Sequence, residues 1–366
     1  MTVVTLYWGL VILNIAAFLS GRKFKLLSLF TSLFLVVFVM GKRPIGGANI
    51  GADYDNYQIA YESGEFFSVD LGYNLINKIA YSLSIPFEAF YMFIVAAIII
   101  TLIIAVIKVG GNLHLFLASY LIYFDMLTID LIRNQCAIAV LALAVFAIYY
   151  KYRNYVPGLL LASSFHVSFL SYFIPFFFCG KKSLSYARKW MTAMLLVFVF
   201  FFLTGTINII KPLLSFLFSF LGAAEDRYAE YLNVNARLSM LLPLFVYIVT
   251  IIGIKYWRSN CINKQSDDES IFMADYVYKF ALLCSIFLVL TFLSIQCYRF
   301  IRDLSLIGII FMGINTSYKC SKLSTRFVVL LFMLAISFGW FYFDVIVKGY
   351  FPDYVGFFYQ NELLNF

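Results

Sequence analysis

Continuous apolar stretches about 20 residues long recur along the whole chain, and they constrain its fold more than any other feature. A helix of roughly this length crosses the ~30 Å hydrocarbon core of a bilayer. The stretches do not alternate with polar residues, so they predict helices and not barrel strands. Spans are expected near 2–20, 26–41, 88–108, 113–124, 131–150, 190–207, 239–257, 275–296, 300–317 and 326–346. We therefore expect an all-α polytopic integral membrane protein with about 10–12 transmembrane or re-entrant helices and two main external loops.

The charge content excludes a soluble globule. Only 13% of the residues are charged, about half of what a soluble domain carries. The net charge of +8 comes from short basic clusters between the apolar stretches, as the positive-inside rule predicts, and we expect no nucleic-acid partner. With two histidines and six scattered cysteines, the sequence predicts no metal site. It also lacks a phosphate-binding loop for nucleotides, so no cofactor is expected.

The sequence shows no separate soluble domain, so we expect one transmembrane domain, 1–366. The distribution of lysine and arginine predicts that its N-terminus lies outside. Loop 42–87 is then external, and the second external loop is expected within 208–238. Segment 156–178 allows two topologies. If it crosses the membrane once, the basic cluster at 181–189 lies outside; if it breaks near His166 and returns, the cluster lies inside. The positive-inside rule favours the re-entrant topology, and a break at that depth implies a cavity lined by protein or water.

Arginines gather on the predicted external side, against the usual bias. They are Arg43, Arg133, Arg227, Arg237, Arg299 and Arg302. A guanidinium forms a bidentate fork with phosphate, so this pattern predicts an anionic ligand outside. Two simpler interpretations remain open: Arg133 could pair with Asp130 at a helix end, and either Arg299 or Arg302 could pair with Asp303.

Three further features suit a sugar-processing site. The segment Asp53-Tyr54-Asp55-Asn56-Tyr57 mixes carboxylates with aromatic faces, which fits sugar hydroxyls and pyranose rings, although it could be an ordinary interfacial loop. His166 lies mid-way in an apolar stretch and could act as a general base or neutral donor, or only bond a neighbouring helix. Segment 70–81 has apolar residues at i, i+4 and i+8, which predicts an amphipathic helix on the external surface.

Five short motifs in order resemble those of one family. They are Gly51-Ala52-Asp53-Tyr54-Asp55-Asn56-Tyr57 (G-x-D-x-x-x-Y), Asp70-Leu71-Gly72-Tyr73 (E-x-G-Y), Arg133-Asn134-Gln135, Phe165-His166-Val167-Ser168 (F-H-x-S) and Arg227-Tyr228-Ala229-Glu230-Tyr231 (R-Y-x-x-Y). Together they cover about residues 40–235. On these motifs the chain resembles the EpsG family of Wzy-type polysaccharide polymerases. Asp70 departs from the usual Glu, and Asn134 intervenes where the family often has adjacent R-Q.

The resemblance implies an O-antigen-type polymerase, a glycosyltransferase that needs neither metal nor nucleotide. Such an enzyme transfers a growing glycan from undecaprenyl diphosphate to the non-reducing end of a new undecaprenyl-diphosphate-linked repeat unit. It works in the bacterial inner membrane with its site facing the periplasm, and a chain-length regulator is a candidate partner. The expected catalytic residues are Asp53, His166 and Arg133, with Asp53 or His166 as the base. The expected substrate-binding residues are Arg43, Tyr54, Tyr57, Tyr73, Arg227, Tyr228, Tyr231 and Arg299. Arg133, Arg227 and Arg299 would hold the diphosphates, and Tyr54, Tyr57 and Tyr73 would contact sugar.

Other functions share much of this pattern. A ligase for O-antigen uses the same donor but would carry one large late external loop, which the sequence does not contain. A transporter or flippase of lipid-linked oligosaccharides commonly has broken helices in matching halves, whereas only one broken segment is expected here. A structural subunit of an export complex is also compatible with the sequence.

Overall fold

The computed structural model describes residues 2–42, 52–64, 70–148, 155–204, 240–263, 268–292, 297–317 and 320–349, with a few positions between 354 and 364. In these residues every regular element is a helix, and the one β-type contact is an isolated bridge between Lys42 and Asn361. Six described helices are long and apolar enough to cross a membrane. The predicted all-α polytopic membrane fold is therefore confirmed.

Every predicted span overlaps an observed helix. The long apolar helices are α1 (Val3–Ser20), α5 (Phe87–Lys108), α11 (Leu184–Thr204), α14 (Leu241–Asn263), α15 (Asp268–Leu283) with α16 (Ile286–Leu290), and α18 (Leu323–Phe341) with η7 (Tyr342–Val347). Shorter elements are α2 (Lys25–Gly41), α6 (Leu113–Ser119), η1 (Tyr120–Phe124), α7 (Asp125–Asp130), α8 (Ile132–Leu141), η2 (Ala142–Ile148) and α17 (Tyr298–Met312). The predicted second external loop, 208–238, lies entirely outside the described residues.

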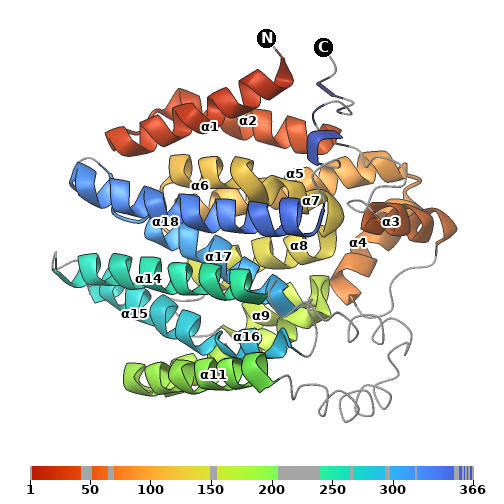
Figure 1. The fold of residues 1–366 in the computed structure, drawn as a ribbon. Helices are drawn as coiled ribbons and strands as arrows, with labels where there is room; N and C mark the ends of the chain where they lie inside the picture. The colour runs from red at the N-terminus through yellow and green to blue at the C-terminus, as the bar shows by residue number, and fades with distance from the viewer. Residues whose placement is uncertain are drawn as a thin grey trace, which may run out of the picture. The chain divides into compact units, whose positions relative to one another are not determined.

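Contacts between helices group the chain into two compact units, residues 1–173 with 309–366, and residues 174–308. In the first unit α1 packs on α6, α2 on α5, and α5 on α8, while α18 returns from the far end of the chain to contact α1 and η1 (Figure 1). In the second unit α15 packs on both α11 and α14. That the whole chain forms one domain stays a prediction.

The predicted break at His166 is present. Helix α9 (Val156–Phe165) ends there, His166 is extended (φ −152°, ψ 111°), and a 3-10 segment η4 (Val167–Tyr172) leads into α10 (Phe173–Lys181). Gly158 lets α9 approach η2 closely, since a Cβ at this position would lie 2.9 Å from a Val145 methyl carbon. The return of segment 156–178 to the same side of the membrane stays a prediction.

Loop 42–87 contains two helices, α3 (Ala52–Ser63) and α4 (Leu71–Ser82), and α4 confirms the amphipathic helix predicted for 70–81. Its faces are inverted relative to a soluble helix, because the apolar residues point outward. Leu71 is 71% exposed, and Leu75 and Ile79 are also exposed. Tyr73 and Asn77 lie on the buried face. A helix with this arrangement fits a position in the bilayer interface, with its apolar face in lipid and its polar face on protein.

Candidate active site

Three of the sequence motifs meet at the carboxylate of Asp70, inside the first unit. Asp70 precedes α4, but its side chain does not cap that helix. Instead its Oδ2 accepts a hydrogen bond from Arg133 Nη1 at 2.6 Å, and its Oδ1 accepts one from the backbone N–H of Val167 at 2.8 Å. The Asp70 side chain is only 2% exposed. One buried carboxylate thus ties together the starts of α4 and α8 and the break after α9.

Arg133 is oriented by two partners. Besides the ion pair with Asp70, its Nε donates to the Tyr57 hydroxyl at 3.3 Å. The Arg133 side chain is 23% exposed, so it is held in place and still reachable. The alternative pairing with Asp130 concerns a side chain outside the described set. Because an arginine held at two points loses less rotamer freedom on binding, this arrangement preorganises it for an anion.

His166 lies at the edge of the same cluster. Its Nδ1 is 3.6 Å from Asp70 Oδ1, and within the described residues that nitrogen makes no hydrogen bond. The helix break brings it there, because the extended backbone at His166 leads directly to the Val167 N–H that bonds Asp70. The two predicted catalytic residues whose side chains are described, Arg133 and His166, therefore share one carboxylate.

The electrostatics favour an ionised Asp70. Burial by itself raises the pKa of this carboxyl, but His166, the Val167 N–H and the Arg133 charge outweigh it. The pKa of Asp70 consequently lies below its usual value. At neutral pH the site holds a carboxylate that balances the Arg133 guanidinium.

The three tyrosines predicted to contact sugar form a packed layer beside Arg133. Tyr54 packs edge-on against Phe87 and Tyr91 of α5, at centroid distances of 5.3 and 4.9 Å. The ring centroids of Tyr57 in α3 and Tyr73 in α4 lie 5.9 Å apart. All three are buried, and Tyr57 presents its hydroxyl to Arg133. They stabilise the frame of the site, and their contact with sugar stays a prediction.

The remaining predicted site residues do not join this cluster in the described structure. Asp53 lies in the first turn of α3, but its side chain is outside the described set. Arg299 lies in α17 and belongs to the second unit. Arg43, Arg227, Tyr228 and Tyr231 are outside the described residues.

Sequence reasoning missed Asp70 as a site residue and treated it only as a departure from a motif. It also missed two buried amide oxygens that lack a hydrogen-bond partner among the described residues, Asn74 Oδ1 on α4 and Gln135 Oε1 on α8. Buried amide oxygens are normally bonded, so these acceptors suit hydroxyl donors or water. A signal was available: Asp70, Asn74 and Asn77 follow at i, i+4 and i+7, which marks one polar helix face.

The cluster can bind a negatively charged group at Arg133 and hydroxyl groups at neighbouring acceptors, with an imidazole at its edge. A family model described as the EpsG family matches residues 25–359, a range that includes all the residues of the cluster. No curated protein and no solved structure matches the chain.

Proposed function

This chain belongs to the EpsG family of Wzy-like polysaccharide polymerases, and we propose that it joins lipid-linked oligosaccharide repeats into a polysaccharide. The growing glycan would move from undecaprenyl diphosphate to the non-reducing end of a new undecaprenyl-diphosphate-linked repeat, on the periplasmic face of a bacterial inner membrane. The observation that carries this proposal is the convergence of Arg133, Asp70 and His166 in one partly exposed cluster.

The leaving group of this transfer is a lipid diphosphate. As the bond from the anomeric carbon to the diphosphate oxygen breaks, the electron pair stays on that oxygen and negative charge develops there. An oriented guanidinium stabilises such charge without reorganising at the moment of reaction, and removing one donor of this kind costs about 10²–10³ in rate. Arg133 fits this role because Asp70 and Tyr57 fix its plane. Arg227 and Arg299 are proposed to hold the second diphosphate.

The attacking group is a sugar hydroxyl, which must lose its proton as its oxygen bonds the anomeric carbon. His166 is the proposed base, since its side chain is 21% exposed at the edge of the cluster. Its buried Nδ1 faces Asp70, which leaves Nε2 for the substrate hydroxyl. The proton then resides on the imidazole, next to the Asp70 carboxylate. Asp53 is the alternative base, with its backbone in the first turn of α3.

An amphiphilic substrate also fits the surroundings of the site. Asp70 directly precedes α4, whose exposed face carries Leu71, Leu75 and Ile79. A polyprenyl chain could lie along this face in the bilayer while its diphosphate reaches Arg133. This supports a lipid-linked substrate over a soluble one.

The test is a gel of surface polysaccharide from a strain deleted for the gene, complemented with wild type, His166→Ala or His114→Ala. Loss of polymerase should reduce the ladder to a core carrying one repeat, because export and ligation still work. His166→Ala should fail to restore the ladder, whereas His114→Ala, which changes the other histidine of the chain, should restore it. Protein levels in the membrane must be matched.

Two outcomes contradict the proposal. If the deletion strain shows no repeat at its surface, the protein acts as a flippase, a ligase or an export subunit. If His166→Ala restores a normal ladder, His166 is not the base and Asp53 becomes the candidate.

A further inference from the structure

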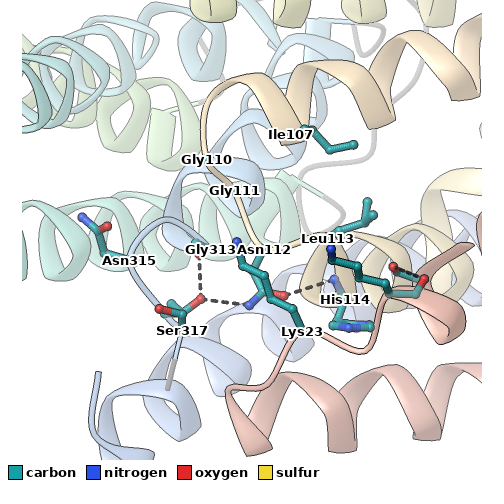
Figure 2. A pocket seen from close by; sticks show the side chains of 13 residues that line it. Lys23, Ile107, Gly110, Gly111, Asn112, Leu113, His114, Gly313, Asn315 and Ser317 are labelled. Carbon is teal, nitrogen blue, oxygen red and sulfur yellow. Dashed lines mark hydrogen bonds between the residues drawn. The ribbon is translucent and has the colours of Figure 1, made fainter. Parts of the chain in front are cut away.

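A second site lies in the first unit, at the opposite end of α5 from the Arg133 cluster. It is a pocket of about 440 Å³ between the loops that follow α1, α5 and α17. Thirteen residues line it, and none of them is acidic. Figure 2 shows Lys23 from the first loop, Asn112 from the second with His114 from the first turn of α6, and Gly313, Asn315 and Ser317 from the third. A volume of this size is ample for a small ligand or a lipid headgroup.

Hydrogen bonds tie the three loops together, so the pocket is preformed. Asn112 Nδ2 donates to Thr316 Oγ1 at 3.2 Å, which joins the second and third loops (Figure 2). The Phe24 backbone N–H donates to His114 Nε2 at 3.3 Å, which joins the first and second. Gly110 sits at the turn after α5 with φ 75°, a conformation that L side chains rarely adopt.

His114 is neutral in this arrangement. Because its Nε2 accepts a hydrogen from Phe24, the ring proton must be on Nδ1, which donates to Asn14 Oδ1 at 2.8 Å. Asn14 in turn donates to Thr31 at 2.9 Å, in α2. His114 therefore has a structural role, and the positive charge of the pocket comes from Lys23 and Lys25.

Lys23 and Lys25 both line the pocket, and neither forms an ion pair with any residue that the structure describes. Other lysines of the same unit differ. Lys42 is paired with Asp125 at 2.7 Å, and Lys348 with Asp344 at 2.7 Å. Two uncompensated ammonium groups at a preformed pocket without acids fit a phosphate group.

The mouth of the pocket borders surface that faces lipid. Ile107 lines the pocket and is 60% exposed, and Leu26, next to Lys25, is 83% exposed. Apolar side chains beside basic ones place this rim at the headgroup level of a bilayer. The adjacent Arg22 and Lys108 predict that this level belongs to the cytoplasmic leaflet.

We propose that this pocket binds the phosphate group of an anionic ligand at the cytoplasmic surface, and the apolar rim favours a membrane lipid headgroup as its source. Such a ligand would bridge the loops after α1, α5 and α17 and fix the end of the unit that lies farthest from the Arg133 cluster. The site is independent of the proposed polymerase reaction.

The test measures lipid binding to the full-length protein in detergent by native mass spectrometry, with phosphatidylglycerol as the anionic probe and phosphatidylcholine as the zwitterionic one. The variant Lys23→Gln/Lys25→Gln should weaken phosphatidylglycerol binding about tenfold or more, from the loss of two charges near the surface. The matched control is Arg22→Gln/Lys108→Gln, which removes the same charge at the same membrane face but from side chains that do not line the pocket. It should retain binding within about twofold.

Equal weakening in both double variants would assign the binding to general surface charge and overturn the site. Unchanged binding in Lys23→Gln/Lys25→Gln would overturn it as well. A competition with inorganic phosphate distinguishes the sources. If phosphate displaces the lipid from the wild type but not the residual lipid from Lys23→Gln/Lys25→Gln, the phosphate site is supported. If phosphate binds and phosphatidylglycerol shows no advantage over phosphatidylcholine, the lipid source is overturned in favour of a soluble phosphate compound.

Discussion

The two ends of α5 carry positive charge in different forms. At the Phe87 end the cation is an arginine, held by a buried carboxylate and a tyrosine hydroxyl. At the Lys108 end, about 30 Å away along a helix of 22 residues, the cations are Lys23 and Lys25, two exposed lysines with no acidic partner among the described residues. A fixed, planar cation suits charge that develops at one place in a reaction. Point charges on flexible stems suit a headgroup that only has to bind. The difference predicts chemistry at one end and ligand binding at the other.

The largest expected effect is that of Arg133→Lys. A lysine keeps the charge but not the fork, so the rate of polymerisation should fall by about 100-fold or more. The measurement is conversion of a synthetic lipid-diphosphate-linked repeat by purified protein. Arg258→Lys is the control, because Arg258 is also ion-paired, to Asp275 in the second unit, and should keep its activity. A normal rate for Arg133→Lys would mean that the reaction does not need a fixed guanidinium. The proposed difference between the Arg133 cluster and the lysine pocket would then fail.

Asp70→Asn should have the next largest effect, a loss of roughly tenfold, since Asp70 acts through Arg133 as a positioning residue. Asp70→Glu should recover most of the activity, because it restores the carboxylate. The pKa of Asp70 is lowered in the folded protein, so its contribution is complete above the usual carboxyl pKa and disappears as pH falls through the lowered one. The deficit of Asp70→Asn should therefore be constant between about pH 5 and 8. A deficit that changes across this range would contradict an ionised Asp70.

A smaller effect is expected from Leu75→Ser/Ile79→Ser on the exposed face of α4. Weaker contact with lipid should raise KM for the lipid-linked substrate about threefold and leave kcat unchanged. The matched control, Leu29→Ser/Leu33→Ser, alters two exposed leucines at the same i, i+4 spacing on α2. Equal changes in both variants would mean that α4 only anchors the protein in the bilayer.

The smallest effect on the reaction is expected from His114→Leu at the pocket end. Loss of its hydrogen bonds to Asn14 and Phe24 should reduce the stability of the unit by about 1–3 kcal/mol. Thermal unfolding in detergent should show a lower Tm, while the activity of the folded fraction stays at the wild-type level. A loss of activity without a change in Tm would show that the pocket end takes part in the chemistry.

Much of the fold could be predicted because the bilayer acts on local sequence. Helices α1, α2 and α5 begin and end within about one residue of the predicted spans. The break at His166 and the amphipathic helix α4 were also predicted. The boundaries of α11, α14, α15 with α16, and α17 were less accurate and differ from the predicted ones by about five to seven residues at one end or both. The π-helical segments η1 and η2 were not predicted, because they depend on packing that hydropathy does not report.

The candidate site was predicted only in part. Arg133 and His166 were identified from their type and place in the apolar pattern, but Asp70, 63 residues before Arg133 and 97 before Val167, was not. The burial of Tyr54, Tyr57 and Tyr73 could not be foreseen either, because a tyrosine in an external loop is compatible with either a wet or a packed surface.

The sequence by itself determined that this chain lies in a membrane as helices, where its basic loops fall, and which family it resembles, because each of these depends on local composition or short motifs. Only the tertiary structure decided which arginine is held by which carboxylate, and which lysines have no acidic partner in the described part of the chain. The physical reason is that ion pairing depends on distances of a few ångströms between residues far apart in the chain. Those distances are set by helix packing and not by hydropathy.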